Sequence, residues 1–191
     1  MKSLFATVLT LCALCLFVGC SSSPKNQEEA DAAKNEVRAM ASQNLDKLES
    51  LAPGTKKAIE SAYGYAAFSN FGMKILVAGG GHGEGVAVSR SPHTETFMKM
   101  AEIQAGLGMG VKKFRLVWVF TTEDSFNGFV NKGWEFGGQA TAQAQKDEKG
   151  AGLAGALAVG PGVYLYQITD TGLALELTVK GTKYYKDSGL N

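Results

Sequence analysis

His82 and Glu84 are the residues whose types and spacing come nearest to catalytic chemistry. They stand two positions apart inside the glycine run 79–85, so they would share one face if that run forms a strand. An imidazole beside a carboxylate can hold a metal or act as an acid–base pair, and it can equally form a surface hydrogen bond. Because no third ligand or nucleophile accompanies the pair, we expect a non-enzymatic protein without metal or cofactor. A hydrolase or metal site at this pair is the least favoured alternative.

Cys20 is the residue that the sequence marks for covalent modification. Lys2, the almost entirely apolar residues 4–18 and then Gly19 follow the pattern of a secretory signal. A small residue directly before a cysteine resembles the lipobox of bacterial lipoprotein precursors, so we expect cleavage after residue 19 and acylation of Cys20, palmitate included. A transmembrane helix is less favoured, because a span needs roughly 20 apolar residues. Ser21 after the cysteine resembles sorting to the outer membrane, with the protein facing the periplasm.

The composition of the mature chain excludes several classes of protein. Two of the three cysteines, Cys12 and Cys15, lie in the predicted signal, so no thiol is left for a disulfide or a cysteine metal site. Removal of 19 residues from 191 leaves 172, enough for one domain with a substantial core. These carry 18 basic and 18 acidic side chains, without the basic excess that nucleic-acid binding needs.

Two short basic clusters are the candidates for ligand contact. One lies at the start of an aromatic strand, and the other combines lysines with tyrosines near the C-terminus. Both side-chain types join an apolar body to a polar tip, which suits the headgroup zone of a membrane, although solvated surface is the alternative. The candidate headgroup contacts are Lys112, Lys113, Arg115, Lys180, Lys183, Tyr184, Tyr185 and Lys186.

Several of the 24 glycines form runs with a period of two. The clearest runs are Gly79, Gly81, Gly83 and Gly85, and then Gly106, Gly108 and Gly110. No lysine followed by serine or threonine stands at the spacing of a phosphate-binding loop. In a strand such glycines share one face and leave the backbone bare. We therefore expect a sharply curved sheet with a helix against this smooth face, and a flat surface for a ligand or lipid is the alternative.

The first part of the mature chain is predicted to be helical. Residues 20–26 form a short polar tether, and residues 27–52 an amphipathic helix with one apolar stripe. Its charged residues are acidic in excess, so we expect the stripe to pack on the protein itself rather than on a membrane. A second, short helix is expected over residues 55–62.

Residues 53–191 are predicted to form the domain proper. Thr122 followed by acids marks the start of one inserted helix, and Gly133 its end. Alternating patterns predict strands over 63–68, 74–78, 115–120 and 140–145, and a hairpin of 163–169 with 172–180. The fold class is α+β, with N-terminal helices packed on a strongly curved, mostly antiparallel, barrel-like sheet.

The order of several motifs resembles the SYLF domain, also called the yeast-type actin-binding domain family. The motifs are Gly64-Tyr65-Ala66-Ala67-Phe68, the glycine run 79–85, residues 106–110, residues 116–120 before a helix, Trp134-Glu135-Phe136-Gly137 and residues 172–185. The resemblance covers residues 51–191 and implies a non-enzymatic domain that binds lipid. Phosphoinositide and actin binding are implied only for eukaryotic relatives, so generic phospholipid binding is the expectation for this chain.

Membrane phospholipid is therefore the expected partner of a lipid-anchored envelope protein. The alternative is a periplasmic scaffold that its anchor merely positions and that meets an envelope protein. No feature of the sequence indicates an oligomeric state.

Overall fold

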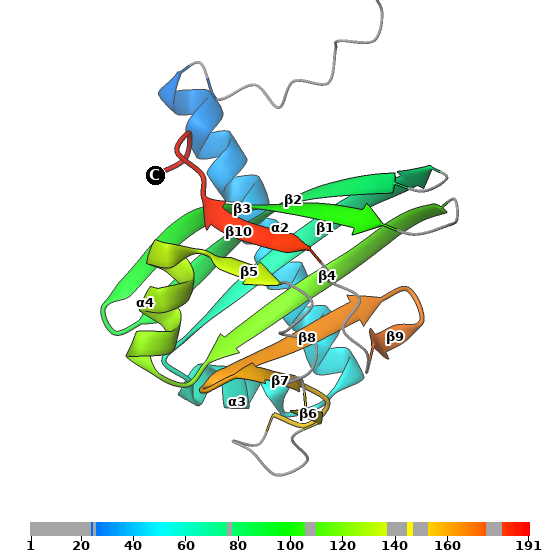
Figure 1. Ribbon diagram of the computed structural model, residues 1–191. Helices are drawn as coiled ribbons and strands as arrows, with labels where there is room; N and C mark the ends of the chain where they lie inside the picture. Colours follow the sequence, from blue (N-terminus) through cyan, green and yellow to red (C-terminus); the bar gives the residue numbers. More distant parts are fainter. Residues whose placement is uncertain are drawn as a thin grey trace, which may run out of the picture.

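The computed structural model describes residues 24, 26–75, 78–105, 110–136, 145–146, 153–174 and 181–191 (Figure 1). The predicted signal and Cys20 lie outside these residues, as do Lys180 and most of the predicted strand 140–145.

Within the described residues the chain forms two helices, four long strands, a third helix and six shorter strands. The helices are α2 (Gln27–Leu51), α3 (Thr55–Ser61) and α4 (Glu123–Lys132). The long strands are β1 (Gly64–Ile75), β2 (Ala78–Arg90), β3 (His93–Ala105) and β4 (Gly110–Phe120). The shorter strands are β5 (Trp134–Phe136), β6 (Gln145–Lys146), β7 (Leu157–Gly160), β8 (Val163–Thr169), β9 (Gly172–Ala174) and β10 (Thr182–Lys186).

All ten strands belong to one antiparallel sheet. Its order is β5-β10-β3-β2-β1-β4-β8-β7-β6, and β9 pairs with β8. The sheet curls into a half-barrel, with α4 against its inner face and α2 and α3 against its outer face (Figure 1). The predicted α+β class, the N-terminal helices and the inserted helix are thereby confirmed.

One predicted break in the sheet is wrong. The sequence suggests separate strands over 63–68 and 74–78, yet β1 continues without interruption from Gly64 to Ile75. Asn70 and Gly72 at its centre pair with β2 on one side and with β4 on the other. Pairing on both sides overrides the poor strand propensity of these two residue types.

Helix α2 packs its apolar stripe against the outer face of the sheet, as predicted. Asn26 caps the helix by accepting a hydrogen bond from the Glu29 N–H at 2.8 Å. The buried residues of the helix are Ala30, Val37, Ala41, Asn44 and Leu48. An apolar stripe that is already covered by the sheet is unavailable to a membrane surface.

Helix α4 begins and ends where the sequence predicts. The Thr122 hydroxyl accepts a hydrogen bond from the Ser125 N–H at 3.3 Å, and Gly133 follows with a φ of 72°. Phe126, Phe129 and Val130 supply its buried side chains. These side chains close the open side of the half-barrel.

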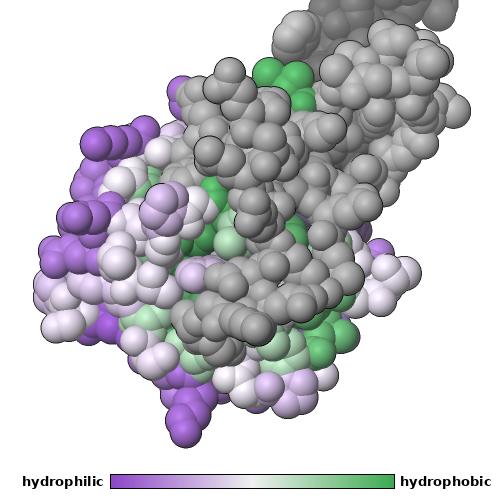
Figure 2. Space-filling model, turned by 60° about the horizontal axis from the view of Figure 1, so that its bottom comes forward, coloured by the Kyte–Doolittle hydropathy of each residue, from purple (hydrophilic) through white to green (hydrophobic). Residues whose placement is uncertain are grey.

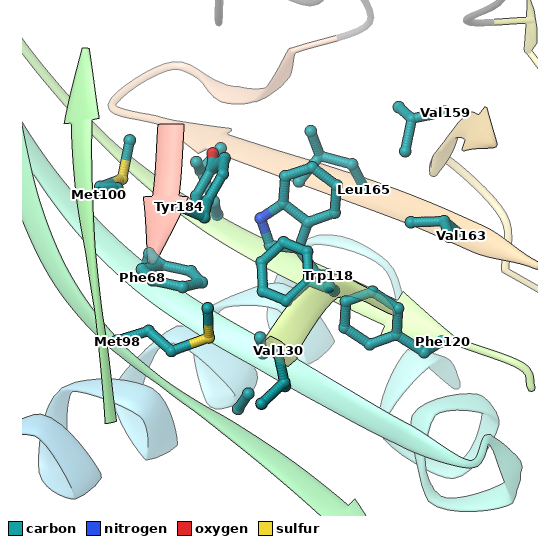
Figure 3. Packing of buried hydrophobic residues seen from close by; sticks show 14 of the residues in the cluster. Phe68, Met98, Met100, Trp118, Phe120, Val130, Val159, Val163, Leu165 and Tyr184 are labelled. Carbon is teal, nitrogen blue, oxygen red and sulfur yellow. The ribbon is translucent and has the colours of Figure 1, made fainter. Parts of the chain in front are cut away.

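Aromatic side chains fill the space between α4 and the inner face of the sheet (Figure 3). The Trp118 ring lies 5.1 Å from both the Phe129 and the Tyr184 ring, and Phe68 lies 5.0 Å from Tyr184, measured between centroids. Each such pair contributes about 0.5–1.5 kcal/mol beyond the burial of its area. Strands β1, β4 and β10, distant in sequence, are thus joined through one core.

The glycine run on β2 is covered by the protein's own core. A Cβ at Gly85 would collide with the Phe68 ring and the Ala67 carbonyl, and one at Gly83 would collide with the Ser69 carbonyl and the Met100 side chain. Because Gly83 and Gly85 have no side chains, the large side chains of Met100 and Phe68 can lie directly over β2 on the inner face of the curved sheet. The alternative of a flat lipid-binding surface is therefore wrong at Gly83 and Gly85. The side chains that cover these glycines come from neighbouring strands, not from a helix.

Candidate functional site

The two basic clusters lie on different strands of the central sheet. Lys113 and Arg115 belong to β4, whereas Lys183 and Tyr185 belong to β10, and three strands lie between β4 and β10 in the sheet order. The alternation of strands β4 and β10 sends these four side chains to the outer face, and all four are exposed. We call this set the basic surface.

The register aligns the two parts of the basic surface. Lys113 stands in register with Lys183 through Phe71, His82 and Ala101 on the three intervening strands. Four interstrand steps of about 4.8 Å separate the Lys113 and Lys183 backbones by about 19 Å along the curved sheet.

A second row runs two residues further along the same strands. There Arg115 stands in register with Tyr185 through Ser69, Glu84 and Lys99. Lys99 is paired with Asp187 at 3.1 Å, so its charge is locally balanced.

Apolar side chains accompany these cations. Ile103 is 75% exposed on β3, and Tyr185 is 41% exposed on β10. Ile103 lies two residues beyond Ala101 and therefore on the same outer face. The edge of the surface near β10 thus combines an aliphatic side chain, a phenol and a lysine, a mixture suited to a membrane interface.

Tyr184 and Lys186 were predicted as headgroup contacts, but they lie on the inner side of β10, away from the basic surface. Tyr184 is completely buried in the aromatic core, so the prediction of a surface role for it is wrong. Lys186 donates to Asn131 Oδ1 of α4 at 2.9 Å, on the inner side of the sheet. Alternation along β10 separates them from Lys183 and Tyr185, which sequence proximity had grouped together. The side chain of Lys112 and the whole of Lys180 lie outside the described residues.

His82 and Glu84 lie on the outer face and are exposed, as their spacing predicts. Together with Glu36 and Met40 of α2 they line a cavity of about 380 Å³. Within the described part of the chain, no group of three His, Cys, Asp or Glu side chains is placed to hold a metal. The geometry therefore gives the pair no metal site among these residues.

A smaller cavity lies beside the β4 part of the basic surface. Among the described residues, pairing between β4 and β8 ends at Arg115 and Ile168, whereas β4 stays paired with β1 as far as Gly110. The opening has a volume of about 120 Å³, and its polar lining consists of Ser69, Asn70, Lys113, Arg115 and Asp170. Charged groups of both signs thus meet at one pocket.

Asn70 connects this pocket to a polar pair inside the half-barrel. Its Nδ2 donates to Glu102 Oε2 at 2.6 Å, and both residues are only 3% exposed. The bond crosses β2, which lies between β1 and β3. Among the described residues, Asn70 Oδ1 has no hydrogen-bond partner.

Sequence reasoning missed this buried pair, although a signal was present. Glu102 follows Met98 and Met100 at a spacing of two, which places a carboxylate on the buried side of β3. Asn70 follows Phe68 in the same way on β1. Extending the alternation through polar positions would have placed both residues in the interior.

The tyrosines near the core are poor acids. Burial raises the pKa of Tyr184 well above its ordinary value, the nearby Glu102 carboxylate raises it further, and a hydrogen bond with Trp118 acts in the opposite direction. Burial alone raises the pKa of Tyr166 to about 12. Both hydroxyls stay protonated at neutral pH.

The described surface is mixed in polarity. In the view of Figure 2, hydrophilic residues gather along the left side, and hydrophobic residues show in smaller patches beside them. None of the described helices is both long and apolar enough to cross a membrane.

The described residues form an α+β protein with a half-barrel sheet, and the exposed part of its outer face carries Lys113, Arg115 and Lys183 together with the acidic Glu84. In sequence the chain is similar to "Beta cell expansion factor A" of Aeromonas veronii, with 33% identity over 170 residues. The alignment covers 88% of this chain but 61% of the relative, so the chain spans about three fifths of that protein's length. No protein-family model matches the chain.

Proposed function

We propose that this protein is a lipid-anchored component of the cell envelope whose SYLF-like domain binds phospholipid membranes. The sequence supports the anchor through the lipobox-like residues before Cys20 and supports the domain through its ordered motifs. The observation that carries the binding function is the basic surface, where cations from two distant strands share one exposed face with Ile103 and Tyr185.

The chemistry of this surface fits an anionic bilayer. Each lysine or arginine near an anionic membrane contributes about 1 kcal/mol of attraction, and Lys113, Arg115 and Lys183 can act together across about 19 Å. The side chains of Ile103 and Tyr185 can enter the interfacial zone beside the headgroups. Because this attraction is electrostatic, binding should weaken as salt shortens the screening length.

Vesicle co-sedimentation tests the proposal. The chain is produced from Ser21, which omits the predicted signal and Cys20 but retains every described residue. We expect binding to vesicles containing phosphatidylglycerol, and Arg115→Glu should weaken it about tenfold because an attraction becomes a repulsion. Lys57→Glu changes charge equally at an exposed position of α3, remote from the basic surface, and serves as the matched control.

Two results would contradict the proposal. One is an absence of salt-sensitive binding to anionic vesicles by the chain from Ser21. The other is an equal loss of binding in Arg115→Glu and Lys57→Glu, which would reduce the effect to net charge. The first result would favour the alternative, a scaffold that its anchor positions for a protein partner.

A further inference from the structure

From the pocket between β4 and β8 we infer that the basic surface selects a zwitterionic headgroup, namely a phosphate ester that carries a primary ammonium. Phosphatidylethanolamine has this chemistry. The inference rests on the proposed membrane-binding function and specifies which headgroup the site holds.

Three side chains of the pocket are suited to a phosphate. Arg115 and Lys113 provide cationic donors, and Ser69, in register with Arg115, adds a hydroxyl. All three side chains are exposed, so a headgroup on a membrane surface can reach them. A guanidinium with an ammonium beside it is a common arrangement for phosphate recognition.

Asp170 is the group of the pocket that is suited to an ammonium. It lies exposed in the turn after β8 and contributes a carboxylate. Asn70 also lines the pocket, but its Oδ1 has less than 1 Å² of exposed surface and is closed to a ligand.

An ammonium carries only donors, and the Asp170 carboxylate can accept from it. A purely anionic group would face Asp170 unfavourably, whereas a zwitterion satisfies both signs of charge. The cavity of about 120 Å³ has room for a headgroup portion but not for acyl chains.

A comparison of two vesicle compositions tests the selectivity. Both contain the same fraction of phosphatidylglycerol; the remainder is phosphatidylethanolamine in one and phosphatidylcholine in the other. The methyl groups of choline remove every N–H donor, so the chain from Ser21 should bind the ethanolamine vesicles about fivefold more tightly. O-phosphoethanolamine should compete for the protein more effectively than phosphocholine or inorganic phosphate.

Asp170→Asn is the decisive variant, because Asp170 is exposed in a turn and its replacement should preserve the fold. We expect its preference for ethanolamine over choline to fall to about twofold or less, since a neutral amide attracts an ammonium less than a carboxylate does. Lys57→Gln is the control and should keep the preference of the unmodified chain.

The outcomes separate the two proposals. Equal binding of the unmodified chain to both vesicle types, or an unchanged preference in Asp170→Asn, overturns the headgroup inference while phospholipid binding stands. Equal competition by inorganic phosphate and O-phosphoethanolamine identifies a simple anion site and also overturns it. A failure to bind either vesicle type overturns both proposals.

Discussion

The outer face of the sheet has two halves that differ although the same strands build both. Beneath α2, Ala67 on β1, Val86 on β2 and Val117 on β4 are buried. The next outward-facing residue on each strand, two positions away from the buried one, is exposed. These residues are Ser69, Glu84 and Arg115. Backbone pairing is continuous across the boundary, so the difference lies in the helix cover and the side chains.

The boundary between the two halves separates the core from the exposed surface that we propose binds lipid. Asn44 of α2 lies at the boundary and donates to the Phe68 carbonyl at 3.0 Å, between the last buried row and the first exposed row. Stability should therefore depend on the covered half, whereas ligand binding should depend on the exposed half.

The largest expected effect comes from uncovering part of the core. Leu48 is fully buried against Val117, Val119 and Tyr166. Leu48→Ala removes this contact and leaves a cavity, so the free energy of unfolding should fall by about 3 kcal/mol in urea titrations. A loss below about 1 kcal/mol would show that α2 contributes little to the covered half.

Loss of the boundary hydrogen bond should cost less. Asn44→Ala removes the donor to the Phe68 carbonyl and should lower the free energy of unfolding by about 1–2 kcal/mol. The neighbouring exposed Gln43 provides a control, because Gln43→Ala should leave stability nearly unchanged. Equal effects of the two changes would contradict a specific role for Asn44.

A smaller effect, dependent on pH, is expected where α2 meets α3. Glu49 accepts hydrogen bonds from the Gly54 and Lys56 N–H groups at 2.8 and 2.7 Å, which lowers the pKa of its carboxyl below the ordinary 4.5. Because the folded pKa is the lower one, this stabilisation is present above 4.5 and is lost as pH falls through the folded pKa.

Glu49→Gln checks the sign of this effect. The variant should melt at a lower temperature than the unmodified chain at pH 7, and the gap should close as the pH is lowered below about 4. A gap that widens in acid would mean that the carboxylate destabilises the junction.

The smallest expected effect on stability comes from the exposed half. Arg115→Ala should change the free energy of unfolding by less than about 0.5 kcal/mol, because the side chain is exposed. Its effect on vesicle binding should be much larger than its effect on stability. A stability loss comparable to that of Leu48→Ala would remove the distinction between the two halves.

Much of the fold could be predicted from local pattern. Asn26 and the apolar stripe define α2, Thr122 and Gly133 define α4, and alternation defines the hairpin at β8 and β9. The length of β1 could not be predicted, because Asn70 and Gly72 are held in the sheet only by pairing on both sides. Among the candidate site residues, Lys113, Arg115, Lys183 and Tyr185 are at the surface, whereas Tyr184 is not.

By itself the sequence determined which residue types are present and the period at which they alternate, because capping and alternation are local properties of the chain. It therefore specified the helices, the glycine ridge and the basic residues. Only the tertiary structure decided that Lys113 and Lys183 share one row and that Asn70 reaches Glu102 across β2. Those relations depend on sheet order and register between strands distant in the chain, which no local pattern encodes.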